Sequence, residues 1–524
     1  MKYIKYNILI ALFLGMMASC GYDLEEYNIN PEVSTNADPD YQLNYVQMVM
    51  LDNHHVNWHM NLGMLSGIAQ HLAGPWEMGA ARAVWVDHDY SYVDWWENSW
   101  LATYKNVVDL VERTKDDPEL VNVNSAARIL KVFTFARLTD AYGDVPYFNA
   151  GKAYYTGELN SPYDLQKEIY DDFFSELDAA VKAFDASKKS IDVDAMFNGN
   201  LNQWKKFGNS LRLRLGMRLV KVNIAKAEQE VKAAIGANGG VMESNADIAM
   251  INHMNIAAED IRNNPVSEVL ERSGFSDFGI CATFSDKLVD TDDPRLDILL
   301  ASYANNDKSE PNHVDVVGYN GLVPASYAWD APALEGTDGV ERGFYEGGYL
   351  VPHKQLVDKD DPSFLLGYAE VQFYLAEAAQ RGWVAGNAAD YYNQGVEAAM
   401  KQLSLYTLEE AISDDQIGEY LTANPYLEAE GLKLINEQLW IHYFLNGHEA
   451  YSNWRRSGYP ELETPPAVDW EPQLYDGIAR RLPYLDEELD RNFDNVNAAV
   501  QRLEAQGATA AARHMDGRVW WDVE

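Results

Sequence analysis

Apolar residues recur at intervals of three and four positions along most of this chain, which is the spacing of one face of an α-helix. The pattern is clear in three runs: Trp204, Phe207, Leu211, Leu215 and Leu219; Tyr368, Val371, Leu375 and Ala378; and Tyr392, Val396, Ala399 and Leu403. Strictly alternating runs, which would indicate strands, are few and short. The pattern therefore predicts a mostly α-helical protein.

Further helices are expected over 42–72, 91–113, 124–142, 164–185, 226–237 and 430–453. Short links between them favour antiparallel pairs. The helical period is lost between about 240 and 362, and segments of this kind are usually functional or disordered. This segment is too aromatic for disorder, with Tyr303, Tyr319, Tyr327, Trp329, Phe344, Tyr345 and Tyr349. No tetratricopeptide consensus repeats at a period near 34 residues, although stacked helix pairs remain compatible with the pattern.

Two local patterns have a structural interpretation. Gly143 is expected to take a left-handed conformation that ends the preceding helix, and Pro146 prevents the helix from resuming. Five arginines lie beside apolar faces in an acid-rich chain, and we expect them to pair with carboxylates at the edge of the core. They are Arg128, Arg137, Arg212, Arg214 and Arg218.

The chain is strongly acidic. Its 524 residues contain 41 Lys and Arg against 81 Asp and Glu, a formal net charge of −40. Such a charge repels phosphate backbones, so a nucleic-acid partner is excluded, and neutral or cationic ligands are favoured. The mean hydropathy of −0.34 excludes a multi-span membrane protein.

The first residues have the pattern of a secretory signal peptide. Lys2 and Lys5 form a cationic start, residues 8–17 an apolar run too short to span a bilayer, and residues 17–20 read Met-Ala-Ser-Cys. A signal that ends on cysteine resembles a bacterial lipoprotein signal, which implies that Cys20 becomes the lipidated first residue and attaches the protein to outer-membrane lipid.

The acidic residues that follow Cys20 indicate where the protein is anchored. Residues 21–26 read Gly-Tyr-Asp-Leu-Glu-Glu and resemble the export tag that sends lipoproteins of Bacteroidota-type bacteria to the extracellular face of the outer membrane. The alternative is an ordinary acidic linker that faces the periplasm. No separating linker is visible further on, so we expect a signal peptide over 1–19, a tether over 20–40 and a single domain over 41–524.

Metal and catalytic motifs are missing. His55 and His59 have the spacing of two metal ligands on one helix face, but no H-E-x-x-H motif accompanies them, and we expect structural histidines. The acidic stretch 290–301 has Arg295 where a calcium loop needs glycine. Cys281 lies in an apolar setting that favours packing. We therefore expect no metal, no cofactor and no catalytic residue.

Aromatic residues in two loops are the candidates for ligand contact, because flat rings pack on the apolar face of a sugar or on peptide side chains. The first loop offers Trp76, Arg82, Trp85 and Tyr90; the second offers Asn320, Tyr327 and Trp329. Trp96, Trp100 and Tyr104, four residues apart on a presumed helix, are assigned to the core instead. The two loops are far apart in sequence and must meet in space to form one site.

Several segments together resemble the SusD/RagB family of nutrient-binding outer-membrane lipoproteins. They are YNINPEVSTNADPDY (27–41), SYVDWWENSWLATYKN (91–106), FARLTDAYGDVPYFNA (135–150), YDLQKEIYDD (163–172), QWKKFGNSLRLRLGMRL (203–219), GYAEVQFYLAEAAQRGW (367–383), IHYFLNGHEAYSNWRRSGYPEL (441–462), RRLPY (480–484) and RVWWD (518–522). They occur in the family's order and extend over nearly the whole chain.

The resemblance implies a fold, a role and a partner. The fold is mostly α, with stacked helix pairs of tetratricopeptide-like type and a large loop-rich ligand-binding portion. The role is capture of an oligosaccharide or oligopeptide at the cell surface, and the partner is a SusC-like TonB-dependent outer-membrane β-barrel that takes up the ligand. Two alternatives remain open from the sequence: a surface-anchored hydrolase of glycans or peptides, since two of the 81 acids would suffice for glycosidase chemistry, and a structural adhesin.

Overall fold

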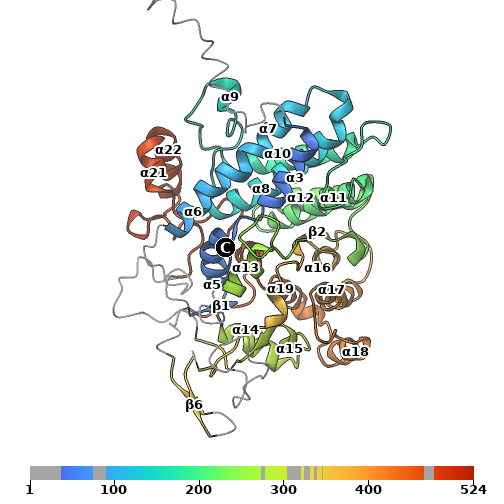
Figure 1. Cartoon of the computed structure of the whole chain (residues 1–524), viewed down its shortest axis with the longest axis vertical. Helices are drawn as coiled ribbons and strands as arrows, with labels where there is room; N and C mark the ends of the chain where they lie inside the picture. The colour runs from blue at the N-terminus through green and yellow to red at the C-terminus, as the bar shows by residue number, and fades with distance from the viewer. Residues whose placement is uncertain are drawn as a thin grey trace, which may run out of the picture.

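Helices packed side by side form most of the body of the protein (Figure 1). The structure is a computed structural model, and it describes residues 37–74, 90–272, 278–303, 320–323, 331–335, 339–344, 346–464 and 477–524. The helices of the first half are α3 (Pro39–Val49), α4 (His54–Val56), α5 (Ser66–Ile68), α6 (Tyr90–Ser99), α7 (Lys105–Thr114), α8 (Val121–Tyr142), α9 (Ala153–Thr156), α10 (Gln166–Ala183), α11 (Leu201–Arg218) and α12 (Ile224–Gly236).

The second half continues in the same way. Its helices are α13 (Pro265–Arg272), α14 (Ala282–Asp290), α15 (Leu296–Leu299), α16 (Tyr368–Gln380), α17 (Ala388–Gln402), α18 (Asp414–Ala423), α19 (Gly431–His442), α20 (Gly447–Ser457), α21 (Asp486–Arg491) and α22 (Phe493–Glu504). The mostly α-helical fold predicted from the sequence is confirmed.

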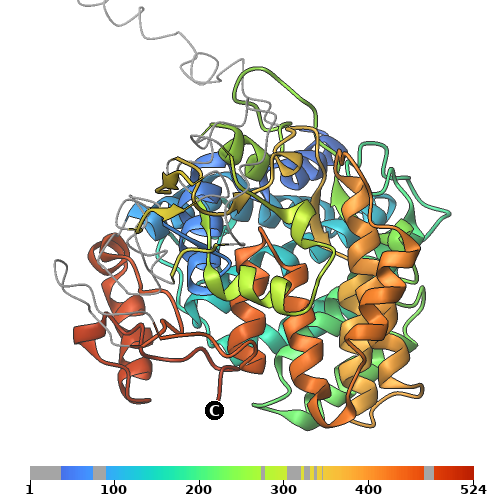
Figure 2. The same cartoon turned by 90° about the horizontal axis from the view of Figure 1, so that it is seen from below.

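Successive helices contact one another along a stack. In the first half, the contacts run α7–α8, α8–α10, α10–α11 and α11–α12. Helix α11 also contacts α16 of the second half. Helix α16 packs on both α17 and α19, and α19 packs on α20. Figure 2 shows α16–α20, in orange, on one side of the body, and the C-terminal segment, in red, on the other. This arrangement agrees with the stacked helix pairs that the resemblance implied.

Three of the predicted helices differ in detail. The run predicted over 42–72 is broken at Asp52, whose φ is +66°, and a π-helical stretch, Asn57–Leu65, joins α4 to α5. A second π-helical stretch, Trp100–Tyr104, joins α6 to α7 in the run predicted over 91–113. The run predicted over 430–453 is two helices, because Leu445 has a φ of +65° and Asn446 caps α20.

Each short antiparallel strand pair has at least one strand in the portion predicted to be irregular. Over the described ranges they are β1 (Leu72–Ala73) with β3 (Gly279–Ile280), β2 (Ala249–Ile251) with β8 (Ser363–Leu366), β4 (Leu300–Ala301) with β7 (Val351–Pro352), and β5 (Leu334–Glu335) with β6 (Glu341–Arg342). Most are two residues long, which is too short for an alternating pattern to reveal.

The helix stop and the arginine pairs follow the sequence analysis. Helix α8 ends at Tyr142 as predicted, and Gly143 follows with a φ of +81°, but its ψ of −119° differs from the left-handed helical conformation that was expected. Each of the five arginines faces a carboxylate: Arg128 faces Glu176, Arg137 faces Asp52, Arg212 faces Glu230 and Asp178, Arg214 faces Glu370 and Glu449, and Arg218 faces Asp140 and Glu449. The last two arginines lie in the interior, so their pairs are structural.

Candidate functional site

The two aromatic loops start from segments that lie next to the same short strand. Leu72 and Ala73 of β1, which precede the first loop, pair with Ile280 and Gly279 of β3. On the other side of this strand, the amide of Leu322 donates to the Ile280 carbonyl at 2.7 Å, and the Ala282 amide donates to the Leu322 carbonyl at 2.7 Å. The stems of the two loops therefore lie on either side of Gly279–Ile280.

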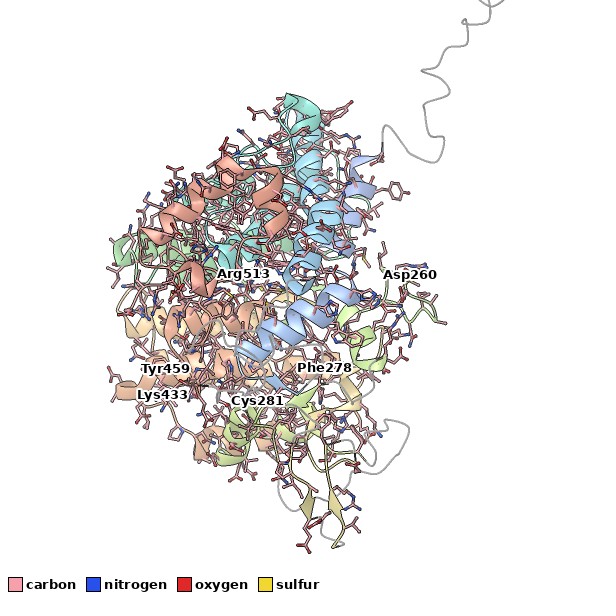
Figure 3. The ribbon with its side chains drawn as sticks, turned by 90° about the vertical axis from the view of Figure 1, so that its left-hand side faces the viewer. Asp260, Phe278, Cys281, Lys433, Tyr459 and Arg513 are labelled. Carbon is pink, nitrogen blue, oxygen red and sulfur yellow. The ribbon has the colours of Figure 1, made fainter. Side chains whose placement is uncertain are left out.

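A small apolar cluster, separate from the main core, fixes these stems, and we call it the stem cluster. It contains Ala73, Cys281, Ala301, Tyr303, Leu322, Phe344, Tyr349 and Val351. One member precedes the first loop, one belongs to the second, and the others come from β4, β7 and their neighbours. Figure 3 shows Phe278 and Cys281 close together at this point. Burial raises the pKa of the Cys281 thiol to about 12, so it packs as an apolar group, as expected.

Two glycines permit the close approach of the stems. A Cβ on Gly279 would clash with Leu322 and would lie 2.8 Å from Cε2 of Phe344. A Cβ on Gly321 would lie 2.5 Å from both Cα of Ala282 and Oγ of Ser285, at the start of α14. Contacts this short do not occur between real atoms, so any side chain at either position would push the stems apart.

Gln70 connects the stem region to a third segment of the chain. Its Nε2 donates to the carbonyl of Glu463 at 2.6 Å, and its Oε1 accepts from Oγ1 of Thr283 at 2.8 Å and from the amide of Glu463 at 3.2 Å. The side chain is fully buried. One glutamine thus ties the end of α5, the start of α14 and the segment that follows α20 into one rigid frame.

His71 packs next to this frame as an apolar ring. Its ring centroid lies 4.9 Å from that of Phe284 and 4.9 Å from that of Trp440, and Phe444 is at 5.9 Å. Neither ring nitrogen has a hydrogen-bond partner among the described residues. Burial lowers the pKa of the ring to about 3, so His71 is neutral at neutral pH.

The structure reaches only part of the predicted ligand site. Asn320 is described: its carbonyl accepts from the amide of Leu350 at 2.9 Å, at the start of the second loop. Tyr90 is the first residue of α6. Five further predicted residues lie outside the described residues, namely Trp76, Arg82, Trp85, Tyr327 and Trp329. The stems of the two loops come together, whereas the site itself stays a prediction.

Trp96 and Tyr104 are buried in the core, as assigned, and Trp100 is partly buried against it.

The candidate metal positions have other partners. Nδ1 of His59 lies 3.4 Å from Oδ2 of Asp94. In the acidic stretch, Arg295 binds the carboxylate of Asp293 through two hydrogen bonds of 2.9 and 2.5 Å, and this pair is buried at the turn between α14 and α15. Within the part of the chain that the structure describes, no three His, Cys, Asp or Glu side chains are grouped so as to hold a metal ion.

A comparison with known protein families identifies the family of this chain. A SusD-like family model, described as "Starch-binding associating with outer membrane", matches residues 31–484. The chain belongs to the SusD-like family. Among the described helices of this SusD-like protein, none is long and apolar enough to cross a membrane.

Solved structures agree with this assignment. A chitin-binding protein is 34% identical, with a TM-score of 0.80 over 93% of this chain and 100% of its own. A SusD-like protein of Bacteroidetes is 29% identical, with a TM-score of 0.82 over the same shares. A chitin-binding SusD homologue from Flavobacterium johnsoniae shares the fold at 24% identity, with a TM-score of 0.70 over 92% of this chain and 97% of its own. No protein with a curated description matches.

Proposed function

We propose that this SusD-like protein captures an oligosaccharide at the cell surface and delivers it to a SusC-like TonB-dependent outer-membrane barrel. The observation that carries the proposal is the 34% identity to a chitin-binding protein over 93% of this chain and all of that one. The family description, starch-binding and associated with the outer membrane, supports both the ligand class and the location.

The chemical class of ligand that we favour is an oligomer of N-acetylglucosamine, the repeating unit of chitin. Two of the similar structures bear the description chitin-binding. A neutral sugar also suits a protein whose net charge is −40, because a neutral ligand meets no electrostatic barrier at an acidic surface. Oligopeptides, the other class implied by the sequence, have no such support.

We assign ligand contact to the two aromatic loops. Trp76, Trp85, Tyr327 and Trp329 would stack on the apolar faces of sugar rings. Arg82 would donate hydrogen bonds to hydroxyl and acetamido oxygens, and Tyr90 and Asn320 would both donate to and accept from these groups. The meeting of the loop stems at β3 supports this assignment, because it places the beginnings of both loops next to each other.

Anchoring would proceed through Cys20 and the tether. The described chain begins where Nη2 of Arg113 donates to the carbonyl of Ala37 at 2.7 Å, so the helical body fixes the end of the tether. We place the protein on the extracellular face of the outer membrane, beside its transporter.

The binding role predicts a specific calorimetric result. We expect a protein made of residues 21–524 to bind N-acetylglucosamine oligomers saturably and to bind peptide digests not at all. We expect Trp76→Ala and Trp329→Ala each to weaken affinity about tenfold, since each removes a stacking surface. Tyr154→Ala is the matched control, because Tyr154 is 92% exposed on α9, remote from the stem cluster in Figure 1. Wild-type affinity in both tryptophan variants would refute the assignment of the loops.

Delivery to a transporter predicts a stable complex. We expect the lipidated full-length protein, tagged at its C-terminus and extracted from outer membranes in mild detergent, to co-purify with a large β-barrel protein. The Cys20→Ser variant, which cannot be lipidated, should be lost from the outer-membrane fraction. A tagged lipoprotein that emerges alone would contradict the proposed partnership.

A further inference from the structure

A cleft of about 350 Å³ lies between α3, α4, α6 and the segment 259–268, and no residue of the stem cluster lines it. Its two sides carry exposed apolar side chains: Tyr45 on α3, 40% exposed, and Ile261 opposite, 52% exposed. The volume is large enough to hold a sugar-sized group together with its bound water. Figure 3 shows Asp260, which lines the cleft, at the outer edge of the molecule.

Planar polar groups with unused hydrogen-bonding capacity line the cleft, and we call Asn53, His54 and Asn98 its floor. Asn53 accepts from the amide of Val56 at 3.0 Å, which leaves its amide nitrogen without a bond among the described residues. The side-chain amide nitrogen of Asn98 donates to the carbonyl of Asp94 at 2.9 Å, which leaves its amide oxygen without a bond among the described residues. His54, only 8% exposed, has Oε1 of Glu259 as its nearest charged neighbour, at 3.7 Å.

His54 is also neutral at physiological pH. Burial lowers the pKa of its ring, and the neighbouring His55 and Arg272 lower it further, against the opposing effect of Glu259 and Glu268. A neutral imidazole offers one donor and one acceptor. Together with the two asparagines, it gives the floor both kinds of hydrogen-bonding group.

Three carboxylates that line the cleft are engaged in ion pairs. Both oxygens of Asp260 accept from Arg262, at 2.7 and 2.6 Å. Glu259 and Glu268 share one partner, Arg272. The two guanidinium groups hold these carboxylates in place as fixed acceptors. A ligand that is rich in hydroxyl groups can donate hydrogen bonds to carboxylates held in this way.

We propose that this cleft is a second carbohydrate subsite, which binds a sugar residue of the same neutral oligosaccharide that the aromatic loops bind. The proposal rests on the proposed function. Tyr45 supplies the flat apolar face, and Asn53, His54 and Asn98 supply donors and acceptors for hydroxyl groups.

A continuous helix separates the cleft from β1, the stem of the first aromatic loop. α4, the π-helical stretch and α5 run without interruption from His54 to Ile68, and β1 begins soon afterwards at Leu72. At 1.5 Å per residue, these fifteen residues span roughly 20 Å. Figure 3 shows Asp260 and Cys281 toward opposite ends of this distance. A ligand that extends from the cleft past this stem therefore needs several sugar residues, and its second contact forms at a high effective concentration.

The test is a series of N-acetylglucosamine oligomers, from the disaccharide to the octasaccharide, titrated into residues 21–524 by calorimetry. We expect Tyr45→Ala and Asn98→Ala each to weaken binding of the longest oligomers about threefold to tenfold, and to leave the shortest unchanged. Tyr41→Ala is the matched control: Tyr41 lies one turn earlier on α3, is 67% exposed and does not line the cleft.

The possible outcomes separate the two proposals. A wild-type protein that binds oligomers, combined with variants that match Tyr41→Ala at every ligand length, overturns the subsite and leaves the capture function intact. A wild-type protein that binds no oligosaccharide overturns both. A loss that is equal for short and long oligomers also overturns the subsite, because the cleft would then be part of the primary site.

Discussion

Replacing Glu449 by alanine is expected to lower the free energy of unfolding by about 3–5 kcal/mol. Glu449 lies in the interior between two arginines: Oε1 accepts from Nη1 of Arg214 at 3.2 Å, and Oε2 accepts from Nη2 of Arg218 at 2.5 Å. Burial alone would raise the pKa of Glu449, but the two guanidinium groups outweigh it and hold this pKa below its usual value. Without the carboxylate, two buried cations lose a shared partner.

Urea unfolding followed by circular dichroism measures this loss, and two further variants check its cause. Lys167→Ala removes one member of an exposed pair with Asp171 and should change stability by less than about 1 kcal/mol. Glu449→Gln keeps the shape but not the charge, and should fall between the wild type and the alanine variant. A Glu449→Ala protein as stable as Lys167→Ala would show that the network is not essential to the fold.

The sequence predicted these arginine pairs only in part. An arginine beside an apolar face of an acidic chain needs a carboxylate, so ion pairing was predictable for Arg214 and Arg218. Their partners were not, because Glu370 and Glu449 come from α16 and α20, far along the chain. Local spacing predicts that each arginine pairs with a carboxylate. Which carboxylate it pairs with depends on how the helices pack.

The helices were predictable because their period is local, but their breaks were less so. Apolar spacing continues through Asp52 and Leu445, so the sequence analysis joined helices that the structure separates. The physical cause is a positive φ at each position, followed by an asparagine, Asn53 or Asn446, whose side chain caps the next helix. Neither residue is a glycine, so the usual mark of a left-handed turn was missing.

The sequence predicted which residue types form the candidate site, but it did not predict where the two loops lie relative to each other. Aromatic residues in two loops with Gly and Pro are visible in the sequence, but the pairing that joins their stems, β1 with β3 and Leu322 beside Ile280, involves segments of two or three residues. Such short segments carry no periodic pattern. The cleft beside Tyr45 was missed for a related reason, since its lining comes from three separate stretches of the chain, 45–55, 98–102 and 259–268, and contains no motif.

Gly321→Val is expected to weaken oligosaccharide binding about tenfold or more while the helical body stays folded. The valine would meet the backbone of Ala282 and Oγ of Ser285 at the start of α14, and overpacking of this kind costs about 1–3 kcal/mol. The strain is relieved most easily by displacement of the short segment 320–323, which carries the second loop. Ligand affinity therefore changes more than helical structure does.

Calorimetry with N-acetylglucosamine oligomers measures the effect, and far-ultraviolet circular dichroism verifies that helical content is unchanged. The matched control is Gly236→Ala at the end of α12, where no heavy atom lies within 4 Å of the added Cβ. This control should bind as the wild type does. If Gly321→Val also binds as the wild type does, the position of the second loop does not depend on its contact with α14, and the meeting of the two stems at β3 would not be what assembles the ligand site.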